Sequence, residues 1–500
     1  MKAVKKYLCI FFAFLIMTGF GIMACNNVSD GYTDAIGPSH VTELEAVGSD
    51  GTVTLTWTDP SDTDFDHILI KYGNESVTVA SGIETYEVTG LTNEEGVQFK
   101  VYSVDKHGNI STVKQTGGIP TKYSGGWILA YFKSNSDGTA DYESLHFGYS
   151  ADGLNYTAIN SGSAVFTIDS ATGSGNTCVR DCYVNRIQDD DASDTESHFI
   201  YMATDWTPYG SSSYSNTTYG TTGATSYWNT ISPCLIMADV TVDTSDNTVT
   251  FSDQRCVRMV TLSDSALSAR SSTQMHAWAP ELIQDAEGNA IYTDGTTSYK
   301  YGVIWSGDGD LDGNDFINRT YINYTNDFTT FTDPQLYFEC TDVADSDSDG
   351  NTSEAVTEID ATVSPKVDGM YYMFYKGEAS GAKDIQEADS SSLAPETFSI
   401  MHDGEYISRT TSQSTGVYVE GPLIVNSNGT WWMFADHYGS TSVTSTANFY
   451  GFSSSDISAA PSNWTKHAND GDYSFPAGVR HATAFRVTTD ELTAFLNTAW

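Results

Sequence analysis

Basic residues are scarce in this 500-residue chain, which has 23 lysines and arginines against 65 aspartates and glutamates and a formal charge of −42 at pH 7. A surface this negative repels the phosphate backbone of nucleic acids, so we expect no nucleic-acid partner. The acids are dispersed among serine, threonine, glycine and asparagine residues. That dispersal favours solubility, and it suits a neutral substrate better than an anionic polymer.

Cysteine is also scarce, and none of its spacings is that of a zinc site. Five cysteines follow Cys25, and because five is an odd number, at least one thiol must be unpaired within the chain. Two of these residues flank a predicted hairpin, "LIMADVTVDTSDNTVTFSDQ", so the bridge that we expect first joins Cys234 to Cys256. The others are Cys178, Cys182 and Cys340.

Long apolar runs are confined to the start, "MKAVKKYLCIFFAFLIMTGFGIMACNN". Three lysines, an apolar run from Leu8 to Ala24 and a cysteine after a small residue indicate a secretory signal. The tetrapeptide "IMAC" resembles the lipobox of bacterial lipoproteins, which implies that Cys25 becomes the lipidated first residue. An uncleaved anchor is the alternative, but the run is short for a span and no basic stop-transfer segment follows.

This resemblance predicts a signal peptide over 1–24 and a polar tether over 25–39. We expect an exported bacterial lipoprotein, held by its lipid anchor at the outer membrane and facing the periplasm or the cell surface. No later segment approaches the length of a membrane span.

Helical periodicity is almost absent, and from 40 to 120 short alternating runs such as "TVTLTWTDP" and "DHILIKYG" recur between turns. This pattern is typical of a small β-sandwich. The stretches "VTLTWTDPSDTDFDHILIKY" and "YEVTGLTNEEGVQFKVYSVDKHGNIS" resemble the fibronectin type III family. That resemblance implies a spacer or contact module, with Trp57, Leu91, Phe99 and Tyr102 in its core.

A distant repeat fills the region 125–500. Aromatic-rich strand candidates recur as "WILAYF", "HFIYMATDW", "YKYGVIWS", "MYYMFYK" and "TWWMFADHY". A second candidate follows each of them, for example "PCLIMADV", "FSIMHDGEYIS" and "NFYGFSSSD". Five such units predict an all-β fold with a five-bladed β-propeller, and a jelly roll is the alternative.

One short motif with a carboxylate precedes four of these strands by 10 to 18 residues. The motifs are "VRDCYV" with Asp181, "AWAPEL" with Glu281, "EIDATV" with Asp360 and "VEGPLI" with Glu420. This is where the innermost strand of each blade should begin. Innermost strands start close together around a propeller axis, so we expect the four acids to meet in one pocket.

Converging carboxylates in an aromatic-rich pocket suit glycoside hydrolysis, which needs a protonated acid at the leaving oxygen and an ionised carboxylate. A third acid nearby can raise the donor's pKa by repulsion between like charges. Flat aromatic faces match the C–H faces of a sugar. Trp206, Trp278 and Trp305 are candidates for that contact, although each could equally lie in the core.

The motifs "VRDCYV", "AWAPEL", "EIDATVSPKVDGMYYMFYK", "VEGPLI" and "VRHATAFRVTTDEL" together resemble glycoside hydrolase family 43. The resemblance implies a five-bladed propeller with inverting chemistry that removes α-L-arabinofuranosyl or β-D-xylosyl units from plant glycans. It assigns Asp181 as general base, Asp360 as the acid that tunes the donor and orients substrate, and Glu420 as general acid. It also implies that Arg480 and His481 form a supporting pair near the axis.

Two motifs depart from the family pattern, since Arg-Asp-Pro is "RDC" here and Arg-His-Gly is "RHA". Neither change removes a reacting group, so we expect activity. Glu281 could contact substrate or even donate the proton, but the Gly-Pro after Glu420 favours Glu420. The candidate substrate-binding residues are Arg180, Trp206, Trp278, Glu281, Arg480 and His481.

Two acidic loops, "DGDLDG" at 308–313 and "DSDSDG" at 345–350, begin like calcium loops. Their twelfth positions are Arg319 and Val356, so neither supplies the closing glutamate. We assign no metal ligands and no required cofactor. A structural calcium ion near the axis is allowed only by the family resemblance.

The sequence thus predicts a monomeric, membrane-anchored, exo-acting and inverting α-L-arabinofuranosidase with a neutral plant-type glycan as substrate. A β-xylosidase or exo-galactanase on the same fold is one alternative. A glycan-binding propeller that has lost catalysis is the other.

Overall fold

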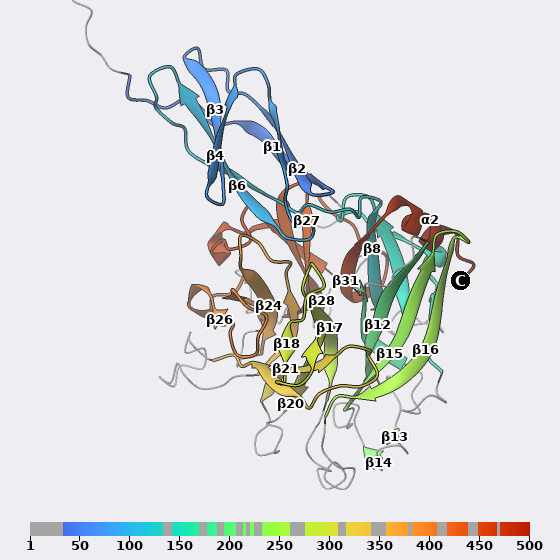
Figure 1. Ribbon diagram of the computed structural model, residues 1–500. Coiled ribbons are helices and arrows are strands. Elements are labelled where there is room, and N and C mark those ends of the chain that lie inside the picture. The colour runs from blue at the N-terminus through green and yellow to red at the C-terminus, as the bar shows by residue number, and fades with distance from the viewer. Residues whose placement is uncertain are drawn as a thin grey trace, which may run out of the picture.

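The computed structural model describes residues 34–133, 143–169, 178–187, 195–206, 233–260, 276–308, 317–341, 357–378, 383–407, 418–438, 449–467 and 471–500, and the strand backbones at 214–216 and 221–224. Strands dominate this part of the chain, and its one α-helix is α2 (Thr489–Asn497) (Figure 1). The predicted all-β class is therefore confirmed.

Two antiparallel sheets form an N-terminal β-sandwich. One contains β1 (Thr42–Ser49), β2 (Thr52–Thr58) and β5 (Thr85–Thr89), and the other contains β4 (Glu75–Ala80), β3 (Phe65–Tyr72), β6 (Val97–Asp105) and β7 (Lys114–Gly118). The alternation in "TVTLTWT" turns Val53, Leu55 and Trp57 into the core between the sheets.

The core residues expected from the fibronectin resemblance are mostly in place. Trp57 and Phe99 are buried, and the partly buried Leu91 packs against the same cluster. The expectation for Tyr102 is wrong, because β6 alternates: Phe99 and Val101 face inward, so Tyr102 faces outward beneath the ammonium of Lys71. Membership of the fibronectin family itself stays a prediction.

Five four-stranded antiparallel sheets dominate the rest of the described chain, and each is named here by its first strand in the sequence. Two short hairpins accompany them, β13 (Tyr214–Asn216) with β14 (Thr221–Ala224) and β18 (Tyr292–Thr293) with β19 (Ser298–Tyr299). The β8 sheet pairs β31 (Val479–Val487), β8 (Gly126–Lys133), β9 (His146–Ser150) and β10 (Thr157–Ala158). The β11 sheet holds β11 (Cys178–Arg186), β12 (Glu196–Trp206), β15 (Cys234–Asp243) and β16 (Thr248–Arg258).

The other three sheets repeat this order. The β17 sheet holds β17 (Trp278–Gln284), β20 (Tyr301–Asp308), β21 (Asn318–Thr325) and β22 (Gln335–Phe338). The β23 sheet holds β23 (Glu358–Val363), β24 (Tyr371–Gly377), β25 (Asp384–Ser390) and β26 (Ser399–Ile400). The β27 sheet holds β27 (Tyr418–Ser427), β28 (Thr430–Tyr438), β29 (Phe449–Ser454) and β30 (Thr465–His467).

The inner strands of these sheets form a closed ring. β11 contacts β17, β17 contacts β23, β23 contacts β27, and β31 contacts both β27 and β11. Because β31 pairs with β8, the last strand of the chain completes the sheet that the first strand of the ring began. Residues far apart in sequence therefore meet at the centre.

The aromatic runs noted in the sequence are β8, β12, β20, β24 and β28, the second strand of each sheet. One prediction of the strand that follows an aromatic run is wrong. The third strand of the β23 sheet is β25, whose sequence "DIQEADS" contains one aliphatic residue larger than alanine, Ile385. The stretch "FSIMHDGEYIS" supplies only the short outer strand β26 and a 3₁₀ turn. Most residues of β25 are buried although its sequence is polar, so hydrophobicity alone does not identify this strand.

The expected disulfide between Cys234 and Cys256 is wrong. In the β15–β16 ladder, Cys234 lies opposite Arg258 and Cys256 lies opposite Ile236, so the two side chains are offset along the hairpin. Both remain thiols, as do the other three cysteines in the described residues.

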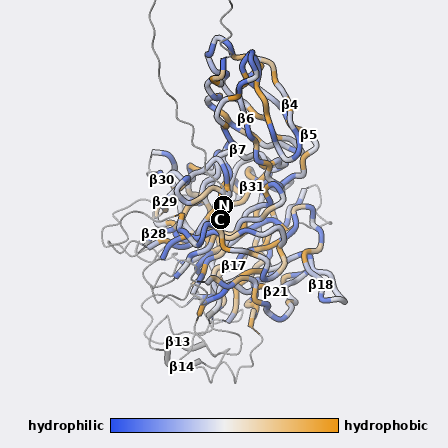
Figure 2. Tube along the Cα trace, turned by 90° about the vertical axis from the view of Figure 1, so that its left-hand side faces the viewer, coloured by the Kyte–Doolittle hydropathy of each residue, from blue (hydrophilic) through white to orange (hydrophobic). Residues whose placement is uncertain are grey.

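The sandwich stands on one end of the ring (Figure 2). Backbone hydrogen bonds join Gly96 to Lys366, Gly117 to Gly429 and Ala46 to Asn428. The Asn426 side chain donates to the Gly117 carbonyl at 3.1 Å. These contacts make the sandwich a docked part of the protein, which fits the contact role better than the spacer role. No helix among the described residues is long and apolar enough to cross a membrane.

Candidate active site

Every inner strand of the ring carries a β-bulge at the same position. The strand register shifts after Arg180, Trp278, Ile359, Glu420 and Arg480. The next residue in each strand has a positive φ: Asp181 (50°), Ala279 (47°), Asp360 (58°), Gly421 (53°) and His481 (26°). A bulge of this kind re-aims a side chain, and strained backbone of this kind clusters at functional sites.

The bulges bring Asp181, Asp360 and His481 together. His481 Nδ1 lies 3.1 Å from Asp181 Oδ1 and 4.0 Å from Asp360 Oδ2. Because both carboxylates are this close to one nitrogen, the two acids belong to a single site. Burial opposes it, but the two carboxylates raise the pKa of His481 to about 10, so the imidazole is charged at neutral pH.

Asp181 is held in its ionised form. The Thr204 hydroxyl donates to Asp181 Oδ2 at 2.6 Å and in turn accepts from the Ala279 amide at 2.9 Å. Burial alone would raise the pKa of Asp181, but the charge and hydrogen bond of His481 lower it below its ordinary value. An ionised carboxylate of this kind can accept a proton from water.

Asp360 lies in a more enclosed position. Its amide donates to Ser306 Oγ at 2.9 Å, and its Oδ2 accepts from the Gly421 amide at 3.1 Å. Burial raises the pKa of Asp360 to about 7, although the charge of His481 opposes the rise, and Glu420 and Asp181 add to it. Asp360 therefore holds a proton more readily than an ordinary aspartate.

Glu420 lies just before its bulge, between two cations. Its Oε1 accepts from Arg480 Nη2 at 2.7 Å, and its Oε2 accepts from Lys376 Nζ at 3.1 Å. Burial would raise the pKa of Glu420, but the charges of Lys376 and Arg480 lower it. In the free protein Glu420 is thus an ion-paired carboxylate.

Sequence reasoning missed the residues that support these acids from the second strands. Thr204, Ser306, Lys376 and Asp436 each lie opposite the residue that precedes a bulge. Asp436 is buried and accepts from Arg480 Nε and from the His481 amide. Burial raises its pKa to about 6. The available signal was a polar or charged residue at the end of a buried aromatic strand, as in "YYMFYK" and "WWMFAD".

Glu281 lies farther along its strand than Asp181 and Asp360 do along theirs. It lies two residues beyond the positive-φ residue of β17, whereas Asp181 and Asp360 are themselves at that position. Its carboxyl group is hydrogen-bonded to Thr362, and burial raises its pKa to about 8. The four motifs look alike in sequence, but the strand register places Glu281 farther along its strand, where the charges of His481 and Asp360 still act on its pKa.

Glu281 instead lines a cavity of about 240 Å³ between the second halves of the inner strands and the sandwich. Glu94 of the sandwich and Ile119 and Tyr123 of the connection also line it. Since Asp181, Asp360 and Glu420 lie in the first halves of their strands, the acid cluster faces the end of the ring away from the sandwich.

Two tryptophans lie beside Arg180, the buried Trp206 at the end of β12 and Trp278 at the start of β17. The rings of Trp206 and Trp278 are 6.2 Å apart, and the Arg180 guanidinium lies 4.1 Å from the Trp206 ring centroid. Arg180 is also ion-paired to the buried Glu143 at 2.6 Å. Trp305, by contrast, is a core residue, because it is 1% exposed and its indole donates to Asn323 Oδ1 at 2.7 Å.

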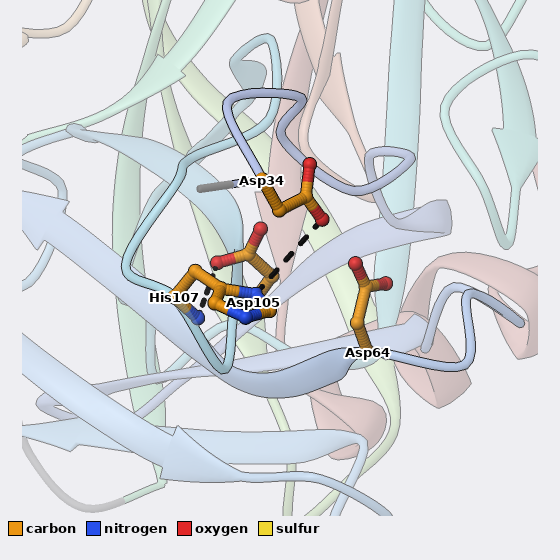
Figure 3. A group of neighbouring side chains, drawn as sticks. All are labelled: Asp34, Asp64, Asp105 and His107. Atoms are coloured by element: carbon orange, nitrogen blue, oxygen red, sulfur yellow. Dashed lines mark hydrogen bonds and ion pairs between the residues drawn. The ribbon is translucent and has the colours of Figure 1, made fainter. Parts of the chain in front are cut away.

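A group of possible metal ligands lies elsewhere, in the sandwich, where oxygen and nitrogen atoms of Asp34, Asp64, Asp105 and His107 are within 4.8 Å of one another (Figure 3). Asp105 is already engaged, because its oxygens accept from the His107 and Asn109 amides and from Asn109 Nδ2, all at 2.8 Å. These bonds hold a tight turn.

The two acidic loops that begin like calcium loops fall mostly on 309–316 and 342–356, outside the described residues, as does Cys25. A structural calcium ion near the axis stays a prediction.

A family model for the glycosyl hydrolase 43-related family, described as "Probable glycosyl hydrolase domain", matches residues 122–493. A search of curated protein sequences found no significant match.

Several solved structures are similar in part. A thermostable family-43 glycoside hydrolase is 13% identical over 61% of this chain and 78% of its own, with a TM-score of 0.35. An exo-1,5-α-L-arabinanase from a bovine ruminal metagenomic library is 12% identical over 71% of this chain and 93% of its own, with a TM-score of 0.34. The Clostridium perfringens spore cortex lytic enzyme SleM is 19% identical over 17% of this chain and 28% of its own, with a TM-score of 0.15.

These TM-scores are too low to support an assignment, so the family rests on the model match. That match covers the connection after the sandwich, the whole ring and most of α2. The chain therefore belongs to the glycosyl hydrolase 43-related family.

Proposed function

We propose that this protein is an inverting, exo-acting glycoside hydrolase that releases α-L-arabinofuranosyl units from a neutral plant-type glycan. One observation carries the proposal: carboxylates from three different inner strands, Asp181, Asp360 and Glu420, are joined through His481, Arg480 and the Gly421 amide into one buried network. Five sheets with one shared bulge position support the blades of a five-bladed propeller around that network.

Asp360 differs from the other two carboxylates, because its pKa is raised to about 7 whereas those of Asp181 and Glu420 are lowered. Hydrolysis needs one group that holds a proton and one that is ionised. Asp181 is kept ionised by His481 and would take a proton from the attacking water. Glu420 would protonate the leaving oxygen, and it is the most exposed of the three, with 23% of its side chain accessible. Asp360 lies between them and would tune Glu420 and orient the sugar.

The preference for arabinofuranosyl groups rests on the sequence motifs. Trp206, Trp278 and Arg180 border the acids and are the side chains that we assign to sugar binding. No cofactor is needed for this chemistry. A β-xylosidase or exo-galactanase would use the same acids, whereas a binding protein would not need three of them with unlike pKa values.

We further propose that the protein acts as a monomeric lipoprotein anchored through Cys25 at the bacterial outer membrane. The support is the lipobox-like "IMAC" and the apolar run before it. Mass spectrometry of the membrane fraction should find an acylated N-terminal Cys25, and Cys25→Ala should yield a protein without acyl mass.

The enzymatic proposal is tested by a panel of aryl glycosides that carry different sugars. We expect the highest kcat/KM on the α-L-arabinofuranoside, and NMR of the first product should show an inverted anomeric carbon. Retention of configuration would contradict the inverting mechanism, and sugar binding without hydrolysis of any substrate would favour the glycan-binding alternative.

A further inference from the structure

Lys376 is a buried lysine at the end of β24. Its side chain is 2% exposed, and its Nζ lies 3.1 Å from Glu420 Oε2 and 2.6 Å from Glu378 Oε1. Lysine is rarely buried unless it is paired, because desolvation of the ammonium is unfavourable. With so little surface exposed, Lys376 acts on any substrate through Glu420.

Glu420 and its neighbours form a chain of alternating charge. On one side, Lys376 is shared between Glu420 and Glu378, and Lys383 lies 3.6 Å from Glu378. On the other side, Arg480 is shared between Glu420 and Asp436. Each cation beside Glu420 thus has a second carboxylate that takes part of its charge.

The remaining ionisable groups around Glu420 come from the adjacent strands. Asp360 of β23 accepts from the amide that follows Glu420, and His481 of β31 contributes a positive charge. Asp384 begins β25 opposite Gly377, beside Lys376. Of all these groups, only Lys376 and Arg480 have an ion pair with Glu420 among the contacts of the described residues.

We propose that Lys376 is a positioning residue and that the Lys376–Glu378 pair sets how strongly Glu420 holds a proton. Lys376 stabilises the Glu420 carboxylate, and Glu378 weakens that effect because it competes for the same ammonium. The two residues therefore act in opposite directions. This inference rests on the proposed function only where it takes Glu420 as the proton donor.

The test compares Lys376→Met with Glu378→Gln through the pH profile of kcat/KM on the preferred aryl glycoside. A donor must be protonated, so activity falls as pH rises through its pKa. Lys376→Met removes a cation from Glu420 and should move this alkaline limb to higher pH by at least about one pH unit. Glu378→Gln should move it to lower pH.

Two control variants separate this effect from a structural one. Lys366→Met removes a lysine that is ion-paired to Glu95 at 3.7 Å, at the contact between sandwich and ring, and should leave the limb in place. Lys376→Arg keeps the charge and should keep the limb near its original pH. Limbs that stay fixed, or that move in the same direction in both test variants, would overturn the proposal. If Lys376→Met does not fold, Glu378→Gln alone decides.

A direct titration separates this inference from the proposed function. With ¹³C-labelled glutamate carboxyl groups, the Glu420 signal is assigned by its loss in Glu420→Gln, and its titration is followed by NMR in each variant. Opposite shifts of that signal in a protein that hydrolyses no glycoside would keep the inference and reject the function. An unshifted signal in an active enzyme would reject the inference about Lys376 and keep the proposed function.

Discussion

His481 Nδ1 lies 3.1 Å from Asp181 Oδ1, although His481 is on β31, the last strand of the ring in chain order, and Asp181 is on β11. They meet because β31 contacts β11 where the ring closes. The backbone of both residues has a positive φ within a bulge. The ring closure and the bulges therefore build the acid cluster together.

His481 should control the ionisation of Asp181. His481→Gln removes the charge that keeps the pKa of Asp181 low, so burial should raise that pKa and the base should be protonated at a higher pH. Loss of kcat/KM should be roughly tenfold or more at pH 5 and smaller at pH 7, where the carboxylate is ionised again. His67→Gln in the sandwich is the control, and an unmoved acidic limb would count against the contact.

The roles of Asp181 and Glu420 should separate by leaving group. A sugar alkoxide needs a proton to depart, whereas a dinitrophenolate does not. Glu420→Ala should therefore lose activity on a natural glycan but keep much of it on a dinitrophenyl glycoside. Asp181→Ala should lose about three powers of ten on both substrates, or about 4 kcal/mol of barrier, because water is no longer activated.

Glu281→Gln is the internal control for that comparison. Glu281 came from the same kind of motif, but its side chain lies on the cavity side of the bulges. It should keep its activity on both substrates. Equal losses on both substrates in Glu420→Ala would remove Glu420 as donor and leave Asp360 as the next candidate.

Much of this site could be predicted from sequence because each inner strand carries a local motif ahead of an aromatic strand. Asp181, Asp360, Glu420, Arg480 and His481 all lie on inner strands, as predicted, and each is at or beside a bulge. The sequence alone could not distinguish Glu281 from these residues. Glu281 lies two residues beyond the bulge residue of its strand, and the position of the bulge is visible only in the strand register.

The supporting residues could not be found for a different reason. Lys376 and Asp436 stand at the ends of apolar runs, where a charged residue is usually solvated. The pairing of each second strand with its own inner strand fixes where they stand, and the contact of each second strand with the inner strand of the next sheet places them against Glu420 and Arg480. Their function is a property of the strand register, which a single sequence does not display.

Docking of the sandwich should depend on Gly429 in the β27–β28 turn. A Cβ there would lie 2.0 Å from Thr116 Oγ1 and 3.0 Å from Ala46, both in the sandwich. Gly429→Ala should therefore destabilise the protein by roughly 1–3 kcal/mol beyond the backbone effect, measured by denaturant unfolding.

Gly369→Ala is the matched control. Gly369 has nearly the same φ, +87° against +88° for Gly429, but a Cβ at Gly369 would meet nothing within 4 Å. The two variants thus share the strain of a positive φ and differ only in the contact with the sandwich. Equal stability of the two would show that the docked contact is not tight.

The pH profile of the unaltered enzyme should identify the proton donor. The pKa of Glu420 is held below its ordinary value of 4.5 by Lys376 and Arg480, whereas the pKa of Asp360 is raised to about 7. The pH dependence of kcat/KM reports the pKa values of the free enzyme, and activity falls as the donor loses its proton. If Glu420 is the donor, the alkaline limb should therefore lie below pH 4.5. An Asp360 donor predicts a limb near 7.

Asp360→Asn makes that comparison decisive, since it removes the competing acid and keeps Glu420, the donor that we propose. Asp360 has a pKa of about 7 and is already uncharged in the pH range where Glu420 titrates, so the alkaline limb should stay below 4.5 while natural-substrate activity persists. If the limb starts near 7 and Asp360→Asn abolishes hydrolysis of the natural glycan but spares the dinitrophenyl glycoside, then Asp360 is the donor, and Glu420 holds the sugar through its ion pairs.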